Sequence, residues 1–217
     1  MTVSQLKKRA VAPEDKTARR AAILRAAEEL SNRSLGFSMD QLARRAGVAK
    51  GTVYLYFGTR EEVLLAVHEK QTHELFDVVE RSLSASSLTG ESVVRTGLRY
   101  LKAHPEFYPL AGNCRGMLDT NVSTEAAFSF KEGIARRLAA LGIRIEELYP
   151  GLRAGEGAAL LTNCYALIVG LWQQADVPLS LRSVMHRPEM QIFKIDFERQ
   201  LSAALLDLWD AVARRGS

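Results

Sequence analysis

Residues 50–56 place one ammonium group, three hydroxyl groups and an isolated leucine within a short stretch of the sequence. The side chain of Lys50 and two tyrosine hydroxyls can donate hydrogen bonds to phosphate oxygens, while Thr52 and Leu55 can meet base edges or a thymine methyl group. Gly51 has no side chain that would hold a nucleic-acid backbone at a distance. The stretch therefore suits a duplex groove, although its spacing fits equally well a buried corner between two helices with solvated polar residues.

Residue types that carry out catalysis or bind metals are few and widely separated in this sequence. The four histidines are His68, His73, His104 and His186, and the two cysteines are Cys114 and Cys164. His68 and His73 are five residues apart, so on one helix they do not share a face. The zinc-protease, nucleophile-elbow and phosphate-loop patterns do not occur. We therefore expect no catalytic site, metal or cofactor, and the two separated cysteines fit a reducing cytoplasm.

Positive charge is concentrated in the first third of the 217-residue chain. Residues 1–68 contain 12 Lys and Arg against 7 Asp and Glu, whereas the remaining residues contain 17 against 18. Such an excess can face a polyanion, but a solvated face with a basic tail would look the same. Apolar residues make up 47% of the chain and charged residues 25%, which predicts a folded globular protein.

Neither a secretory signal nor a membrane span is expected. Three basic residues at positions 7–9 are not followed by an apolar stretch. The most apolar window, residues 158–172, is interrupted by Thr162 and Asn163 and is shorter than the roughly 20 residues that a span needs. We expect a cytoplasmic protein without a membrane partner.

Apolar side chains recur at intervals of three and four residues throughout the chain, beginning with a stripe within residues 23–30. No sustained two-residue alternation and no internal repeat accompany this pattern. The expected fold class is therefore all-α. The predicted helices cover about residues 14–31, 39–46, 50–57, 60–82, 91–103, 123–141, 152–175 and 191–214, with irregular segments at 84–90, 112–120 and 178–188.

The second and third predicted helices have the dimensions of a helix-turn-helix, with about eight residues on each side of a tight turn. Gly47 suits the left-handed backbone that such a turn requires. Leu42 and Ala43 supply the inner face of the first member. Val53 and Phe57 are expected to pack the second member against it.

These segments resemble the TetR family of bacterial repressors. The resemblance rests on Ile23–Ala27, Leu35–Ser38, Leu42–Phe57 and Arg60–Leu64, which fit the family pattern in one register without gaps. Its most distinctive part is Ala46–Phe57. The resemblance implies a flexible basic arm at residues 1–13, a three-helix DNA-binding domain at residues 14–66, and a larger helical effector-binding and dimerisation domain at residues 67–217.

The resemblance also implies that the third helix enters the major groove of a double-stranded operator. By this resemblance, Lys50, Gly51 and Thr52 begin the recognition helix. Tyr54 and Tyr56 contact phosphate or sugar, and Leu55 contacts bases. Ser38 and Arg60 contact backbone phosphate. Two positions depart from the family pattern. Ser31 replaces an aromatic residue, and Ala49 replaces the usual Ser or Thr, which removes an N-cap worth about 1 kcal/mol.

Beyond residue 82 the resemblance is one of architecture alone. A small organic effector is expected among the middle helices, where apolar walls carry a few polar groups. The candidate effector residues are Phe107, Tyr108, Arg115, Met117, Leu118, Phe128, Tyr165, Trp172 and Gln173. The candidate homodimer-interface residues are Trp172, Phe197, Leu201, Leu205 and Trp209. Members of both sets can instead belong to the chain's own core, and Arg115 can instead pair with Asp119 or Glu125.

The expected function is that of a ligand-responsive repressor that releases a pseudo-palindromic operator when its effector binds. Two alternatives stay open from the sequence. One is a non-catalytic helical adaptor that has lost DNA binding, and the other is a helical enzyme or stress protein with an incidental helix-turn-helix corner. Salt-dependent binding to duplex DNA separates the repressor from both.

Overall fold

The computed structural model describes residues 13–32, 34–84 and 89–216, and every regular element within these ranges is a helix. The α-helices are α1 (Pro13–Ser31), α2 (Met39–Ala46), α3 (Lys50–Tyr54), α4 (Arg60–Leu83), α5 (Gly90–Ala103), α6 (Phe107–Asp119), α7 (Thr124–Leu148), α8 (Glu156–Ala175) and α9 (Phe197–Ala213). Short 3-10 helices occupy Leu179–Leu181, Val184–His186, Pro188–Phe193 and Arg214–Gly216. The predicted all-α class is confirmed. Of the expected basic arm, only Pro13 lies within the described residues, as the first residue of α1.

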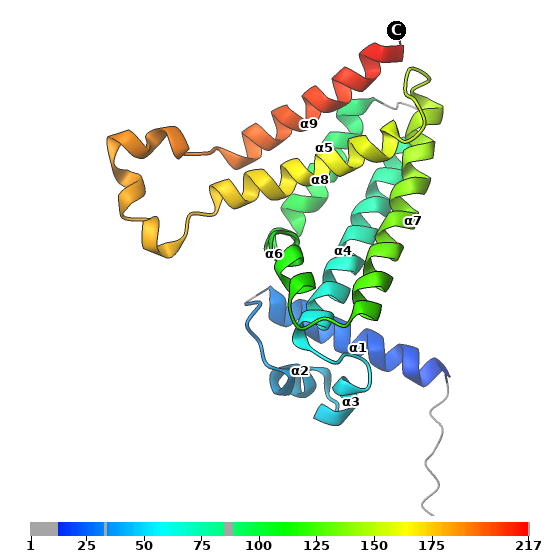
Figure 1. Cartoon of the computed structure of the whole chain (residues 1–217), viewed down its shortest axis with the longest axis vertical. Coiled ribbons are helices and arrows are strands. Elements are labelled where there is room, and N and C mark those ends of the chain that lie inside the picture. The colour runs from blue at the N-terminus through cyan, green and yellow to red at the C-terminus, as the bar shows by residue number, and fades with distance from the viewer. Residues whose placement is uncertain (1–12, 33, 85–88, 217) are drawn as a thin grey trace, which may run out of the picture.

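Helices α1 to α3 form a small unit at one end of the molecule, against the beginning of α4 (Figure 1). Ile23, Leu42, Val53 and Val63, one from each of the first four helices, are fully buried in its core. The same core extends to side chains of α6 and α7, including Leu110. Because packed interiors transmit displacements, a shift of α6 or α7 reaches the small unit directly.

Helix α2 begins and ends with the local geometry that its sequence favours. The Ser38 hydroxyl accepts a hydrogen bond from the Gln41 N–H at 3.2 Å, and the Gln41 side-chain oxygen accepts one from the Ser38 N–H at 2.7 Å. This reciprocal pair is a capping box. Gly47 ends α2 with a φ of +67°, in the left-handed region that glycine tolerates.

Helix α3 is shorter than predicted. It begins after Ala49, whose side chain makes no capping hydrogen bond, and it ends at Tyr54. The next residues close in a tighter turn, because the Tyr56 N–H donates to the carbonyl of Val53 at 3.0 Å. Leu55 and Tyr56 therefore follow the recognition helix instead of lying within it.

Helices α4 and α7 run side by side, while α8 and α9 lie together across the end far from the small unit (Figure 1). Helices α7 and α8 cross where Gly142 faces Gly157, and a Cβ atom on Gly157 would lie 2.2 Å from the Gly142 carbonyl oxygen. This close approach requires a glycine inside α7, which continues to Leu148, although the sequence predicts an end near residue 141. Helix α8 begins at Glu156, four residues later than predicted.

Residues 112–120 were predicted to be irregular, but nearly all of them belong to helix α6. Pro109 lies in the first turn of this helix, where a missing N–H leaves no helical hydrogen bond unmade. Gly112 is required by packing, since a Cβ atom there would lie 2.5 Å from a ring carbon of Trp172. The predicted irregular segment is therefore wrong, because Gly112 packs against Trp172 and does not interrupt the helix.

Residues 177–195 form an arm that projects away from the helices it connects, α8 and α9 (Figure 1). The sequence predicts an irregular connection at residues 178–188 and a helix from residue 191, but 3-10 turns continue to Phe193 and α9 begins at Phe197. Of the loop expected at residues 84–90, residues 85–88 lie outside the described part of the chain. Among the described residues, none of the helices has an apolar stretch that could cross a bilayer.

Candidate DNA-binding surface and effector cavity

The helix-turn-helix presents a polar face with one large apolar side chain at the free end of the small unit. Val53 and Phe57 point inward and are 0% and 5% exposed, whereas Leu55 is 82% exposed and Tyr54 47% exposed. Lys50 and Gly51 are also exposed, and nothing lies within 4 Å of the position of a Cβ atom on Gly51. The half-buried residues of this face are Thr52 and Tyr56. Of the eight residues expected to contact DNA, four form an exposed surface on α3 and the turn after it that is not used for packing within the chain: Lys50, Gly51, Tyr54 and Leu55.

The ammonium group of Lys50 is held by the carboxylate of Asp40 at 3.0 Å, which joins α3 to α2. The hydrogen bond and the charge of Asp40 raise the pKa of Lys50, so the side chain is cationic at neutral pH. Both side chains are more than half exposed. An exposed pair of this kind is weak, so a phosphate group can replace Asp40 at small cost.

Ser38 and Arg60 lie at the starts of α2 and α4. The Ser38 hydroxyl uses an acceptor lone pair for its capping bond, so its hydrogen is left to donate. Arg60 forms an ion pair with the neighbouring Glu61 at 2.6 Å. The N-cap of α4 is Thr59, a residue that the sequence analysis did not single out.

The beginning of α4 is fastened to the turn between α6 and α7. The Thr59 hydroxyl donates a hydrogen bond to the carbonyl oxygen of Asn121 at 2.6 Å. The carboxylate of Glu62 accepts hydrogen bonds from Ser123, the N-cap of α7, and from the N–H of Gly58. We call this set of contacts the junction. It connects the segment that follows the recognition helix to the larger domain.

A cavity of about 210 Å³ lies between α4, α6, α7 and α8. It is lined by His68, Thr72, Phe76, Cys114, Phe130, Lys131, Ile134, Leu138, Leu161, Thr162 and Tyr165. A second, apolar cavity of about 80 Å³ lies between α4, α5, α8 and α9. Because Thr72, Phe76, Leu161 and Tyr165 line both, the two cavities are neighbours separated by a single layer of side chains.

His68 is a buried polar residue at the wall of the larger cavity, only 2% exposed. Its Nε2 lies 3.1 Å from the hydroxyl of Tyr165, and its Nδ1 is buried without a hydrogen-bond partner among the described residues. Burial lowers the pKa of His68 to about 4, and the charge of Lys131 acts in the same direction. The imidazole is therefore neutral at physiological pH. Burial also raises the pKa of the Tyr165 hydroxyl, which stays protonated.

The structure does not gather the nine candidate effector residues into one site, and Tyr165 alone among them lines the larger cavity. Phe107 is fully buried and packs on the His68 ring at a centroid distance of 5.3 Å. Tyr108 stacks on Trp172 elsewhere in the molecule, with centroids 6.4 Å apart. Met117 is buried in the core of the small unit, and Leu118 packs against that core.

The remaining candidate effector residues lie at or near the surface. The Arg115 side chain is 93% exposed and lies 3.7 Å from Asp119, the alternative that the sequence analysis left open. Phe128 is 62% exposed on α7. Gln173 donates a hydrogen bond to the carbonyl of Gly112 at 3.0 Å.

Apart from Tyr165, the polar residues that face the cavity, on α4 and α7 above all, are not among those predicted from the sequence. Three neighbouring polar residues of α4, His68, Gln71 and Thr72, are buried at positions where its helical stripe would otherwise be apolar. Polar residues at core positions are the signal that was available, because buried polar groups require partners. Nothing in the sequence distinguishes Lys131 from the other cations of α7.

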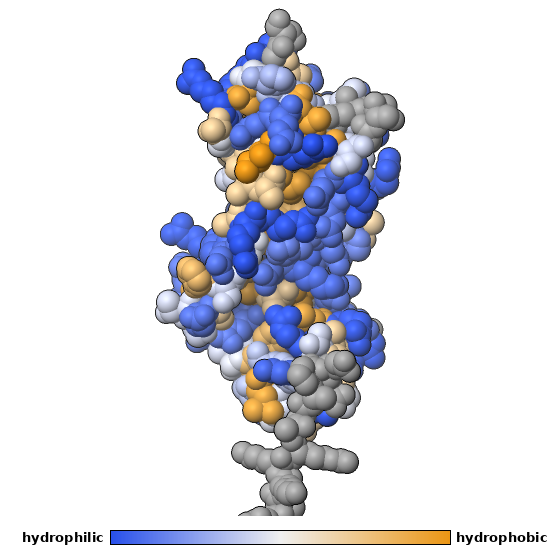
Figure 2. Space-filling model, turned by 90° about the vertical axis from the view of Figure 1, so that its right-hand side faces the viewer, coloured by the Kyte–Doolittle hydropathy of each residue, from blue (hydrophilic) through white to orange (hydrophobic). Residues whose placement is uncertain are grey.

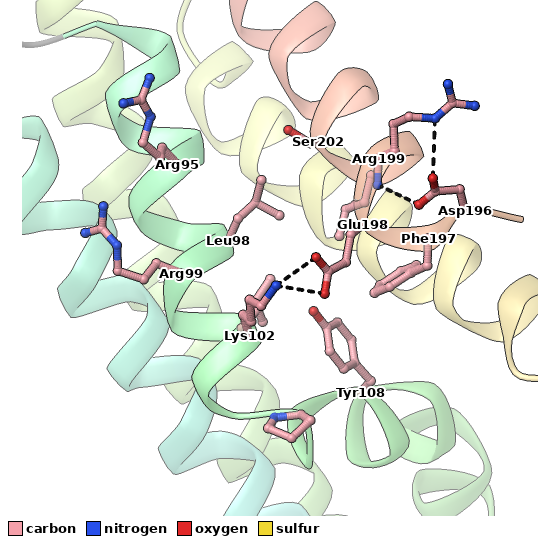
Figure 3. Close-up of a pocket in the computed structure, with 13 residues that line it drawn as sticks. Arg95, Leu98, Arg99, Lys102, Tyr108, Asp196, Phe197, Glu198, Arg199 and Ser202 are labelled. Carbon is pink, nitrogen blue, oxygen red and sulfur yellow. Dashed lines mark hydrogen bonds and ion pairs between the residues drawn. The ribbon is translucent and has the colours of Figure 1, made fainter.

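A wide surface groove of about 730 Å³ lies between α5 and the beginning of α9, with Tyr108 and Phe197 at one side (Figure 3). Four cations border it, but three of them already pair with carboxylates of the chain. The pairs are Lys102–Glu198 at 2.9 Å, Arg199–Asp196 at 3.5 Å, and Arg95–Glu91. Burial raises the pKa of Tyr108 to about 12, and the charge of Glu198 adds to this effect. Arg99 is the one cation of the groove that no carboxylate of the described residues pairs, so most of the positive charge here is neutralised within the chain.

Three of the five candidate dimer residues are part of the chain's own core. Leu201, Leu205 and Trp209 are each no more than 5% exposed and pack on α5. Trp209 packs closely on Gly90, because a Cβ atom added to Gly90 would lie 2.9 Å from the Cβ atom of Trp209. Trp172 and Phe197 are half-buried. The inner face of α9 therefore packs in the chain's own core, which is the alternative that the sequence left open.

Comparison with known proteins places both parts of the chain in one family. Residues 23–67 match the family model described as bacterial regulatory proteins of the tetR family. Residues 69–212 match the model described as a tetracyclin repressor-like C-terminal domain. No curated protein sequence matches the chain significantly.

Solved structures with this fold cover nearly the whole chain. A putative transcriptional regulator from Rhodococcus sp. RHA1 has a TM-score of 0.58 and 17% identity, covering 91% of this chain and 99% of its own. NemR from E. coli, in its reduced form, has a TM-score of 0.55 and 19% identity, with coverages of 88% and 96%. The fatty acid degradation regulator FadR from Bacillus halodurans has a TM-score of 0.54 and 16% identity, with coverages of 87% and 94%.

The fold, the exposed face of α3 after a capped α2, and the two matching family models agree with one another. The family models together cover residues 23–67 and 69–212, which is most of the chain. This chain belongs to the TetR family of bacterial DNA-binding transcriptional regulators.

Proposed function

We propose that this regulator is a repressor that binds a pseudo-palindromic operator as a homodimer and releases it when a small organic effector binds. The observation that carries the proposal is the free surface of α3 and of the turn that follows it, where Tyr54 is 47% exposed and Leu55 82% exposed. A leucine so exposed at the tip of a domain has no packing role. In a major groove it would be covered by base edges and thymine methyl groups.

The other residues of this surface would hold the phosphate backbone on either side. Lys50 would exchange Asp40 for a phosphate oxygen, and the hydroxyls of Tyr54, Tyr56 and Ser38 would donate hydrogen bonds to phosphate or sugar. Thr52 and Leu55 would remain to read bases. Gly51 would allow close approach because the space beside its Cα is empty.

The test is equilibrium binding to a DNA duplex selected by this protein from a random-sequence library. We expect log Kd to rise linearly with log salt concentration, since phosphate contacts release counterions. Lys50→Ala should weaken binding to all sequences and reduce the salt slope by about one. Tyr54→Phe should weaken binding by about tenfold through the loss of one hydrogen bond.

The matched control is Arg144→Ala, which removes an exposed cation near the C-terminal end of α7, away from α1–α3 and from the arm. It should leave affinity and salt slope unchanged. Binding that is absent, or that does not respond to salt, would favour the non-catalytic adaptor instead of the repressor.

We infer that the second subunit packs on the outward faces of α8 and α9 and on the arm. The outward faces carry small exposed residues such as Ala166 and Ala203. On the arm, four large apolar side chains are exposed within this chain: Leu179 (77%), Leu181 (48%), Ile192 (85%) and Phe193 (59%). By contrast, the middle of the face along α7 is covered by hydrophilic side chains (Figure 2). A two-fold dimer would place two recognition helices on successive half-sites, roughly 34–36 Å apart.

Sedimentation equilibrium tests this assembly. The double substitution of Leu179 and Phe193 by serine should weaken dimerisation by at least tenfold, whereas Leu55→Ser, at an equally exposed leucine on the DNA-binding unit, should not change it. A wild-type chain that stays monomeric at micromolar concentration would contradict the dimer.

The response to effector would pass through α7 and the junction. The larger cavity is bordered by α7 at Phe130 and Lys131, and the N-cap residue of the same helix, Ser123, is hydrogen-bonded to Glu62. An effector that binds better when α7 is displaced would shift the population toward a conformation with a different α4 orientation. The spacing of the reading helices would change with it.

A further inference from the structure

The larger cavity contains one positive charge and no negative charge among its eleven lining residues. The charge belongs to Lys131 on α7. Its Nζ lies 5.7 Å from the centroid of the Phe130 ring, and no carboxylate of the described residues comes within salt-bridge distance of it. The next acid along the helix, Glu132, is directed to Arg136 at 3.8 Å. Lys131 therefore differs from the cations of the surface groove, three of which are paired.

The charge of Lys131 is felt inside the cavity. Burial raises the pKa of the Cys114 thiol and lowers that of His68, and in both cases the positive charge of Lys131 contributes a downward shift. Both groups are neutral at physiological pH, so neither balances the ammonium charge. An anion brought into the cavity would do so.

The two threonine hydroxyls of the lining already use their hydrogens within the chain. The Thr72 hydroxyl donates to the carbonyl of His68 at 2.8 Å, and the Thr162 hydroxyl donates to that of Ala158 at 2.9 Å. The Tyr165 hydroxyl is engaged with His68. One hydrogen of this neutral pair is left over, but Lys131 supplies the charged donors of the lining.

The rest of the wall is apolar and aromatic. Its side chains are Phe76, Phe130, Ile134, Leu138 and Leu161. Phe76 and Leu161 also line the smaller cavity, whose remaining lining is almost entirely apolar. A rotation of one of these side chains would lengthen the apolar space away from Lys131. The two volumes, about 210 Å³ and 80 Å³, are below the roughly 300–1,000 Å³ of sites for drug-sized ligands.

We propose that the effector is a small monoanionic amphiphile, an organic acid whose carboxylate pairs with Lys131 and whose apolar body lies between Phe76, Phe130 and Leu161. This inference rests on the proposed function for the existence of an effector, and it adds the chemical class. The acid binds at the mouth of the cavity, where Lys131 remains exposed, and its apolar end points toward the smaller cavity.

Titration calorimetry of the full chain with three probes tests the class. Octanoate carries both the charge and the apolar body, 1-octanol carries the body alone, and acetate carries the charge alone. We expect octanoate to bind at least tenfold more tightly than 1-octanol, and acetate not to bind measurably. Lys131→Gln should lose at least tenfold in octanoate affinity and leave 1-octanol unchanged, while Lys131→Arg should retain octanoate binding to within about threefold.

Two further variants separate the cavity from the surface. Leu161→Trp, which fills the space that both cavities share, should abolish binding of octanoate and 1-octanol alike. Lys102→Gln, in the surface groove, should change neither. Circular dichroism and thermal unfolding of each variant establish that it is folded.

The proposal is overturned by equal affinity for octanoate and 1-octanol, by octanoate binding that survives Lys131→Gln, or by a wild-type protein that does not bind octanoate. DNA binding measured on the same samples keeps the two proposals apart. A protein that binds its selected duplex but not octanoate refutes the ligand class alone. A protein that binds octanoate in a Lys131-dependent way but binds no duplex refutes the repressor and supports the ligand class.

Discussion

The carboxylate of Glu62 accepts two hydrogen bonds from Ser123, one from its backbone N–H at 3.1 Å and one from its hydroxyl at 2.8 Å. The two residues are 61 positions apart in the chain, in the first turns of α4 and α7. The other oxygen of the same carboxylate accepts the N–H of Gly58 at 2.8 Å. One side chain therefore joins the turn after α3 to α7, the helix that borders the larger cavity.

Removing the charge of Glu62 should destabilise the protein and make its stability less sensitive to acid. Burial would raise the pKa of Glu62, but the hydrogen bonds from Ser123, Gly58 and Thr59 outweigh this effect and lower it. A lowered pKa contributes stability above the pKa of the unfolded chain, and this stability is lost as the pH falls through the folded value. We expect Glu62→Gln to cost about 1 kcal/mol at pH 7.

Urea unfolding at several pH values from 7 down to 3 measures this difference, which should shrink as the pH falls below the ordinary pKa of 4.5. Glu147→Gln, in an exposed pair with Arg144 within α7, is the control and should have almost no effect. If both variants lose the same free energy of unfolding, the contacts of Glu62 at the junction stabilise the protein no more than an exposed ion pair does.

A serine at position 49 should supply the cap that α3 lacks. Ala49 has φ of −67° and ψ of 147°, the extended conformation of an N-cap residue, but its methyl group accepts no hydrogen bond. We expect Ala49→Ser to raise the free energy of unfolding by about 1 kcal/mol and to tighten DNA binding. Ala139→Ser, at an exposed position inside α7, is the control; a gain of similar size there would argue against capping.

Two leucine-to-alanine substitutions should have opposite consequences. Leu201 is 1% exposed in the core between α5 and α9, so Leu201→Ala should cost about 2–5 kcal/mol through lost burial and a residual cavity. Leu55 is 82% exposed, so Leu55→Ala should leave stability within about 0.5 kcal/mol and weaken DNA binding. Thermal unfolding and DNA titration of both variants check the pair. If the Leu201→Ala protein has normal stability but does not dimerise, Leu201 belongs to the subunit interface and not to the core.

Acid should destabilise the protein through His68. Because burial lowers the pKa of His68 to about 4, the neutral imidazole stabilises the folded state above the ordinary value of 6.5, and this contribution is lost as the pH falls from 6.5 toward 4. His68→Gln should flatten the decline of unfolding free energy in that range. His186→Gln, at an exposed position on the arm, should follow the wild type. An unchanged slope in His68→Gln would mean that His68 is not the group responsible.

Local features of the small unit could be predicted because they depend on neighbouring residues. The cap at Ser38, the turn at Gly47 and the absent cap at Ala49 each involve partners within a few positions, so the sequence contains both sides of every interaction. The length of α3 was wrong because periodicity does not distinguish an α-helical turn from a tighter one. Gly112 and Gly142 misled the predictions of α6 and α7, since their partners, Trp172 and Gly157, lie far away in sequence.

The sequence by itself determined the fold class and the family, because helical periodicity and a compact, ungapped pattern are local properties. Only the tertiary structure decided which side chains meet across helices. Leu201, Leu205 and Trp209 lie in the chain's own core, and Arg115 lies at the surface. His68 and Lys131 line one cavity, although they come from different helices. A helix carries apolar residues on more than one side, and the choice of the face that packs inward is made by its neighbours.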